Sequence, residues 1–101
     1  MQLDLAPKNY DLVLYILGQF VSDNEVWAFG SRVTGTARKY SDLDIAIIND
    51  CPLPLSITAD LNNAFSESDL PIKVDVVDYA ACDESFQIII KTNHIVIKEA
   101  I

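Results

Sequence analysis

Apolar residues recur at helical spacing in three segments of the chain. They return every three or four residues, as in an amphipathic helix with one face against a core. Pro7 suits the first turn of the first segment, and Asp83 is a capping residue for the last. The pattern predicts helices over residues 7–22, from about residue 55 to 65, and in a short segment after Asp83. The apolar positions that define them are Leu12, Ile16 and Phe20; Ile57, Leu61 and Phe65; and Phe86, Ile89 and Ile90.

Four shorter segments are apolar and rich in β-branched or aromatic residues, which is typical of strands. They cover residues 26–29, 43–48, 72–79 and 95–97. Strands that alternate with helices predict an α/β (α+β) fold, a small sheet with helices packed on it. The 101 residues are enough for one hydrophobic core but too few for two, so we expect a single domain over residues 1–101.

The net negative charge of the chain limits the kinds of partner that it can bind. Fifteen acidic residues face seven Lys or Arg, which gives a net charge of −8. Such a surface repels phosphate backbones, so we expect no direct nucleic acid binding, although a basic protein or metal cations remain possible partners. The longest stretch without a charge, Leu12–Ser22, is too short to span a bilayer, and the two cysteines match no zinc spacing. These features predict a cytoplasmic protein without a membrane segment.

Two acids stand at the head of an otherwise apolar strand. Asp42 and Asp44 bracket Leu43. Side chains two apart on a strand point to the same side, with their Cβ atoms roughly 6–7 Å apart. Like charges at that spacing repel unless a cation lies between them, and hard cations such as Mg²⁺ prefer carboxylate oxygens. The pair is a candidate metal site, although solvated acids at a strand entrance would give the same pattern.

A third acid interrupts another apolar strand. Asp75 lies between two valines, where a carboxylate is costly unless it is paired, binds a metal or faces water on an edge strand. Asp78 follows three residues later and therefore faces the opposite side of a regular strand. Only one of the two can join Asp42 and Asp44, and we predict that it is Asp75. Three acids on neighbouring strands can hold one or two Mg²⁺ ions for nucleotidyl transfer.

A glycine–serine turn and most of the nearby positive charge lie between the first two strands. Gly30 lets the backbone approach a phosphate closely, and the amides after it can donate to that phosphate. Three of the seven basic residues, Arg32, Arg38 and Lys39, fall in the loop that follows Ser31. The clustering predicts a triphosphate contact, although loop solvation explains any single one of them equally well.

Taken together, these residues resemble the polymerase-β-type nucleotidyltransferase superfamily. Gly30-Ser31, ten further residues and then Asp42-Leu43-Asp44 match its G-S-x10-D-x-D signature. The segment 74–78 and the chain length resemble its minimal, single-domain branch. The resemblance covers residues 26–79 and implies a mixed sheet with flanking helices.

The resemblance also implies a reaction and roles for residues. ATP and Mg²⁺, with two ions expected, would transfer a nucleoside monophosphate to an acceptor hydroxyl. Asp42, Asp44 and Asp75 match the three metal-binding catalytic acids, and the Gly30–Ser31 turn matches the triphosphate site. We assign further nucleotide contacts to Arg32 and Ser41, which lie within the signature run.

The resemblance further implies a partner. Members of this branch are often encoded beside an HEPN-domain ribonuclease toxin and act as its antitoxin, some by adding AMP to a toxin tyrosine. Two classes of function follow, a protein adenylyltransferase or a binding module that neutralises its partner by contact alone. The intact acids favour the transferase, because a chain that only binds has no need of three clustered carboxylates. Transfer to a small molecule lacks support, since the sequence shows no second domain to form an acceptor pocket.

Overall fold

The structure is a computed structural model that describes residues 2–100. Helices and strands alternate along the chain, as the hydrophobic pattern predicts. In order, the elements are α1 (Pro7–Phe20), β1 (Glu25–Phe29), α2 (Ser31–Thr34), β2 (Leu43–Ile48), α3 (Leu55–Ser66), β3 (Val74–Asp78), the 3₁₀ turn η1 (Tyr79–Ala81), α4 (Glu84–Thr92) and β4 (His94–Lys98).

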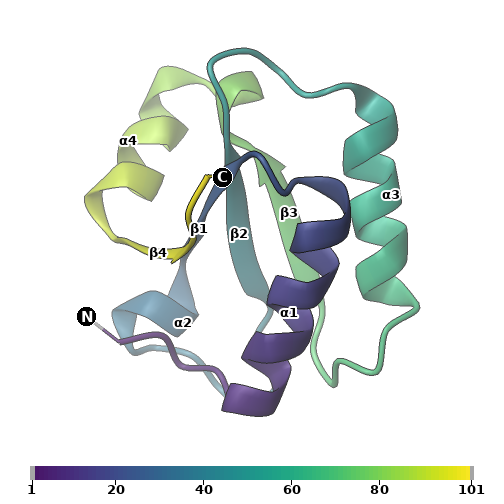
Figure 1. The fold of residues 1–101 in the computed structure, drawn as a ribbon. Helices are drawn as coiled ribbons and strands as arrows, with labels where there is room; N and C mark the ends of the chain where they lie inside the picture. Colours follow the sequence, from purple (N-terminus) through teal and green to yellow (C-terminus); the bar gives the residue numbers. More distant parts are fainter. Residues whose placement is uncertain (1, 101) are drawn as a thin grey trace.

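The strands form one mixed sheet of four, in the order β3-β2-β1-β4 (Figure 1). The two central strands, β1 and β2, are antiparallel, and β4 pairs with β1 in the same sense. β3 runs parallel to β2, because α3 carries the chain back to the starting end of β2 before β3 begins. The predicted fold class, a small sheet with flanking helices, is confirmed.

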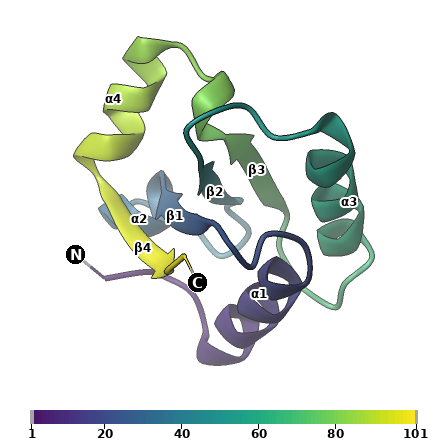
Figure 2. The ribbon, with the colours of Figure 1, turned by 45° about the horizontal axis from the view of Figure 1, so that its top comes forward.

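Helices cover the two faces of the sheet unequally. α1 and α3 pack side by side on one face, whereas α4 alone lies on the other (Figures 1 and 2). The larger hydrophobic core lies under α1 and α3, and the smaller one joins Phe29, Ala46 and Ile90 beneath α4. Because strand residues alternate between faces, every second residue of β2 enters the larger core: Leu43, Ile45 and Ile47 are completely buried.

Several predicted boundaries move by a few residues. α1 ends at Phe20 rather than at residue 22, and β3 covers 74–78 rather than 72–79. The second strand and the β4 strand appear where the sequence places them, and the Asp83 side chain caps α4 by accepting from the N–H of Phe86 at 2.9 Å. The apolar face predicted for α4 is wrong in part, because Ile90 is buried whereas Ile89 is 62% exposed. A single helix on this face leaves less core to fill.

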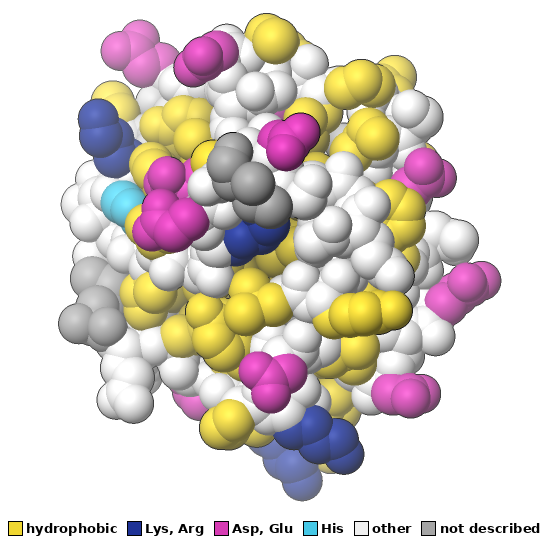
Figure 3. All heavy atoms as spheres, in the orientation of Figure 1, with side chains coloured by type: hydrophobic (Ala, Val, Ile, Leu, Met, Phe, Trp, Pro, Cys, Tyr) yellow, Lys and Arg dark blue, Asp and Glu magenta, His cyan; other side chains and the backbone are white. Residues whose placement is uncertain are grey.

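The surface shows more acidic than basic side chains, as the composition predicts. In Figure 3, carboxylates are scattered over the visible face. Basic side chains show at its upper left, near its centre and, as the largest group, at its lower end, near the start of α1 and the loop between α2 and β2. Over residues 2–100, no helix has the length and apolar character needed to cross a membrane. The largest group of basic side chains on this face thus adjoins the turn that the sequence marks as a phosphate site.

Candidate active site

A tight turn joins β1 to α2 and brings the predicted phosphate-binding residues to the end of the sheet. Gly30 has φ 80° and ψ −156°, a conformation that side chains oppose, and Gly35 closes the short helix with φ 85°. The amides of Val33 and Thr34 both donate to the carbonyl of Gly30, at 3.0 and 3.1 Å. The earlier amides of the turn, those of Ser31 and Arg32, are left without a helical acceptor.

This turn touches the second acid of the signature. β1 and β2 pair so that Phe29 lies opposite Asp44, which places Gly30 directly beside the Asp44 carboxylate. A Cβ atom added to Gly30 would overlap Asp44 Oδ2. Gly30 is therefore required for space as well as for backbone conformation. Two parts of the signature that are fourteen residues apart in sequence are in contact in the fold.

The three acids assemble on two adjacent strands. Asp42 immediately precedes β2, and the parallel register pairs Asp44 of β2 with Asp75 of β3. The pKa of Asp44 is raised above its ordinary value of 3.8, first by burial and then by the negative charges of Asp75 and Asp42. Within residues 2–100, no three His, Cys, Asp or Glu side chains form a ready-made metal site by themselves. The negative charges of Asp75 and Asp42 thus reach the Asp44 carboxylate, although the three carboxylates are not gathered into a cation site in this structure.

Asp78 belongs to a different environment, as the alternation along β3 predicts. It is paired with Ile47, whose side chain lies in the larger core, and so faces away from Asp75. Its Oδ2 accepts a hydrogen bond from the N–H of Leu53 at 2.8 Å, and its Oδ1 is buried with no partner among the described residues. Asp78 therefore holds the loop before α3 and takes no part in the acidic cluster.

Comparison with known proteins agrees with this arrangement. The family model described as polymerase beta, nucleotidyltransferase, matches residues 11–100. The chain belongs to this family. A relative from Haemophilus influenzae, named probable protein adenylyltransferase MntA, is 51% identical over 98 residues, which cover 97% of this chain and 86% of the relative. The nucleotidyltransferase family therefore accounts for the signature, the mixed sheet and the paired acids together.

Solved structures of related fold point the same way. A toxin–antitoxin complex with AMP-PNP aligns with a TM-score of 0.76 at 22% identity and covers 91% of this chain and 74% of its own. A tri-AMPylated Shewanella oneidensis HEPN toxin in complex with MNT antitoxin aligns with a TM-score of 0.68 at 20% identity, covering 92% of this chain and 71% of its own. At this identity the likeness shows the nucleotidyltransferase fold.

Two further residues of the signature run have structural partners. Arg32 is only 6% exposed, and its guanidinium donates to the carbonyls of Asp4 at 2.7 Å, Lys39 at 3.2 Å and Ser41 at 2.9 Å. Arg32 therefore braces the N-terminal segment against the loop before Asp42, and its nucleotide contact stays a prediction. The Ser41 hydroxyl accepts from the N–H of Arg38 at 2.8 Å and so closes the turn ahead of Asp42. Its nucleotide contact stays a prediction.

The other two basic side chains of the loop make no hydrogen bonds to protein carbonyls among the described residues. Arg38 and Lys39 are both exposed, and the Lys39 ammonium lies over the Tyr40 ring, 5.3 Å from its centroid. They lie in the loop whose shape Arg32 and Ser41 fix. The sequence located the cluster of positive charge, but it carried no signal that the fold buries the arginine closest to the turn, Arg32, and leaves Arg38 and Lys39 exposed.

Proposed function

We propose that this nucleotidyltransferase is a Mg²⁺-dependent protein adenylyltransferase that moves AMP from ATP to a hydroxyl, expected to be a tyrosine, of a partner protein. The partner we propose is an HEPN-domain toxin, which makes the chain its antitoxin, working in the cytoplasm as a single domain over residues 1–101. The observation that carries the proposal is the register that sets Asp44 beside Asp75, with Gly30 in contact with Asp44. The name of the 51% identical relative and the AMP-PNP complex of a structural neighbour support it.

The three carboxylates have the chemistry that a divalent cation requires, because hard cations prefer carboxylate oxygens. Burial first, and then the negative charges of Asp75 and Asp42, raise the pKa of Asp44, and a bound cation would offset both effects. We infer that these three carboxylates would hold Mg²⁺, with two ions expected. When bound, Mg²⁺ supplies charge stabilisation at the transferring phosphoryl group.

The remaining steps follow from the protein's own residues. The backbone of the Gly30–Ser31 turn binds the triphosphate, and the Asp75 carboxylate accepts the proton of the acceptor hydroxyl. The acceptor oxygen forms a bond to the α-phosphorus while the bond from that phosphorus to the β-phosphate oxygen breaks, and pyrophosphate leaves. Because attacking and leaving oxygens lie in line, the turn and Asp75 must flank the α-phosphate from opposite sides.

Co-expression with the neighbouring toxin tests the proposal. We expect the purified toxin to be heavier by one or more AMP units on a hydroxyl residue, as measured by intact-protein and peptide mass spectrometry. Asp42→Asn should still form the complex, since docking needs no metal, but should leave the toxin mass unchanged.

Contact-only neutralisation gives a different result in the same experiment. In that case the parent protein would inhibit the toxin fully while the toxin mass stayed unmodified, and Asp42→Asn would protect cells as well as the parent does.

A further inference from the structure

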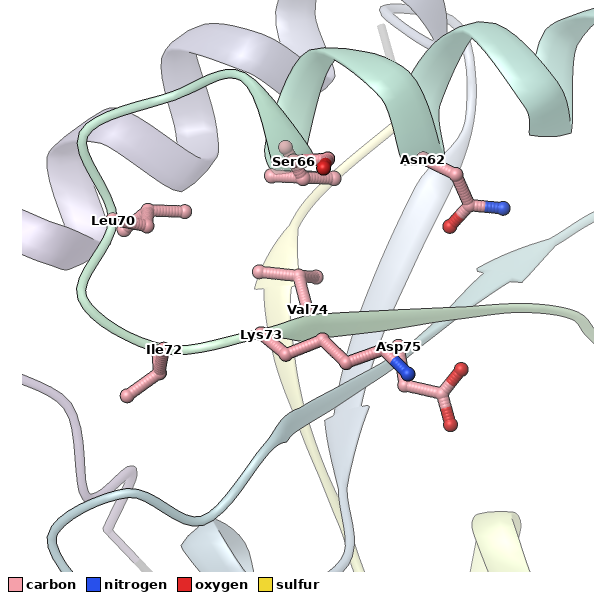
Figure 4. Close-up of a pocket in the computed structure, with 8 residues that line it drawn as sticks. Asn62, Ser66, Leu70, Ile72, Lys73, Val74 and Asp75 are labelled. Carbon is pink, nitrogen blue, oxygen red and sulfur yellow. The ribbon is translucent and has the colours of Figure 1, made fainter.

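The acids Asp44 and Asp75 lie on the face of the sheet that carries α4. Figure 4 shows the pocket between α3 and β3, into which Val74 points, whereas the Asp75 carboxylate points to the other side of the strand. The register places Asp44 beside Asp75 on that other side. Asp75 is exposed and Asp44 is half-buried, so both can be reached from solvent. In the proposed function, a protein that receives AMP must therefore approach the face with α4.

One aromatic contact links α4 to these acids. Within the described chain, α4 and the η1 turn before it are the helices that pack on this face (Figures 1 and 2). Phe29, which pairs with Asp44 across the strands, packs edge-on against Phe86 of α4, with ring centroids 5.9 Å apart and 80° between the ring planes. Contact thus runs from Asp44 through Phe29 to the helix. A protein that reaches the acids over this face must meet α4.

The side of α4 that faces solvent is apolar. Phe86 is 36% exposed, Ile88 57% and Ile89 62%, and we call these three residues the α4 patch. Ile89 follows Phe86 by three residues, so the two lie on the same side of the helix. The charged residues of α4, Glu84 and Lys91, lie roughly opposite Ile89. Large apolar side chains grouped on one exposed surface are typical of a docking site, whereas those scattered singly need no partner.

The charge around the α4 patch favours one kind of partner. Asp83 and Glu84 lie at the start of α4 and are exposed, and Asp44 and Asp75 lie on the same face of the sheet. Two copies of a chain with a net charge of −8 would bring these acids together if they paired through the patch, and opposed like charges disfavour association. The positive charges of a basic protein would instead complement the acids. The patch therefore fits a basic partner better than a second copy.

We propose that the α4 patch is the docking surface for the partner protein, and that the partner contributes an apolar surface bordered by Lys and Arg. The proposal rests on the proposed function and adds where the HEPN toxin binds. Apolar contact with the patch holds the toxin over the face of the sheet that carries Asp44 and Asp75. The acceptor hydroxyl then enters from this face. The patch supplies affinity for the toxin and takes no part in the bond changes.

Two exposed isoleucines and one distant leucine provide a matched test. The double variant Ile88→Gln with Ile89→Gln removes apolar surface from the patch without adding charge. Gln is a good helix former, so α4 should stay folded. Phe86 is left unchanged because it contacts Phe29. Leu55→Gln is the control, since Leu55 is 87% exposed at the start of α3, on the other face of the sheet.

Four properties of the parent and the two variants are compared. Calorimetry measures the affinity for the purified HEPN toxin and, separately, for Mg²⁺-ATP. The rate of AMP incorporation is measured as a function of toxin concentration, and light scattering gives the mass of each protein alone in solution.

We expect the double variant to lose at least about tenfold in affinity for the toxin, or about 1.4 kcal/mol, because the apolar contact is weakened. It should need at least about tenfold more toxin to reach half of its maximal rate. Its rate at saturating toxin and its affinity for Mg²⁺-ATP should match those of the parent, since the acids are unchanged. Leu55→Gln should match the parent in all four measurements.

Other results would separate this proposal from the proposed function. Parental affinity of the double variant for the toxin would overturn the docking surface and leave the proposed function standing. Weakened Mg²⁺-ATP binding in the double variant would also overturn it, by assigning the patch to the nucleotide. A dimeric parent with a monomeric double variant would overturn it by assigning the patch to a second copy. A parent that binds the toxin but never modifies it, with binding lost in the double variant, would overturn the proposed transfer and support the docking surface.

Discussion

The two faces of the sheet are made by the same strands but have opposite characters. On the face under α1 and α3, β2 contributes Leu43, Ile45 and Ile47, all completely buried. On the other face the same strand contributes Asp44 and Ala46, and α4 alone covers part of it. Leu43 and Asp44 are adjacent in sequence, yet one belongs to the core and the other to the acidic cluster. Because side chains alternate along a strand, a residue that stabilises the core is followed directly by one that belongs to the candidate active site.

The difference shows how a small domain tolerates repelling charges. The pKa of Asp44 is raised by burial and then by the negative charges of Asp75 and Asp42, so the ionised Asp44 carboxylate destabilises the fold locally. The larger core under α1 and α3 offsets that cost through burial of apolar surface. A site of this kind trades stability for function, so substitutions on the two faces should have different signatures.

The largest expected effect tests the difference between the two faces on β3, because this strand supplies one acid to each face. Asp75→Asn should lower the rate of AMP transfer by roughly 10²–10⁴-fold, because it removes a metal ligand and the proton acceptor. Asp78→Asn should change the rate by less than about threefold, since an amide oxygen still accepts from the N–H of Leu53. Initial rates at saturating Mg²⁺-ATP, with circular dichroism as a check on folding, measure both. A greater loss for Asp78→Asn would show that the acids had been assigned to the wrong faces.

A smaller effect is expected from the two glycines that flank α2. Both have positive φ, so alanine is strained at each, by roughly 1–3 kcal/mol. At Gly35 there is open space for the added Cβ, whereas at Gly30 it overlaps Asp44 Oδ2. Gly30→Ala should therefore lower the melting temperature more than Gly35→Ala and should weaken Mg²⁺-ATP binding, which Gly35→Ala leaves near the parental value. Thermal unfolding and calorimetry compare the two variants. Equal losses of melting temperature and of Mg²⁺-ATP affinity would show that the contact between Gly30 and Asp44 does not matter.

Much of the fold and the core of the site could be predicted from the sequence, because both depend on periodicity. The run Leu43–Ile48 appears as a strand with the same limits, and alternation alone separates Asp75 from Asp78. The spacing from Gly30 to Asp44 carried enough information to place the turn and the acid in one site. Short-range pattern thus determines which residues share a face.

What could not be predicted depends on contacts between distant segments. The burial of Arg32 requires the N-terminal segment to pass beside it, since Asp4 is one of its acceptors, 28 residues away. The hydrogen bond from the N–H of Leu53 to the Asp78 carboxylate links residues 25 apart. Ile89 is exposed because one helix covers that face, a fact that helical periodicity does not contain.

The smallest expected effect concerns the stability of the acidic face itself. The folded-state pKa of Asp44 is raised above 3.8, so its ionised form disfavours folding at neutral pH. The free energy of unfolding of the parent, relative to Asp44→Asn, should therefore rise as the pH falls from neutral through the folded-state pKa toward 3.8. At pH 7 in EDTA, Asp44→Asn should be the more stable protein, by less than about 1 kcal/mol, because Asp44 is only half-buried and solvent screens its neighbours. Urea unfolding at pH 7 and at pH 4.5 measures the difference in the free energy of unfolding, which should shrink at the lower pH.

Added Mg²⁺-ATP should reverse the order of stability of the parent and Asp44→Asn at pH 7, because only the parent gains stability from a ligand that binds its folded state. A mutant that is less stable than the parent in EDTA at pH 7 would mean that Asp44 stabilises the fold, and the two faces would then not differ in the way described.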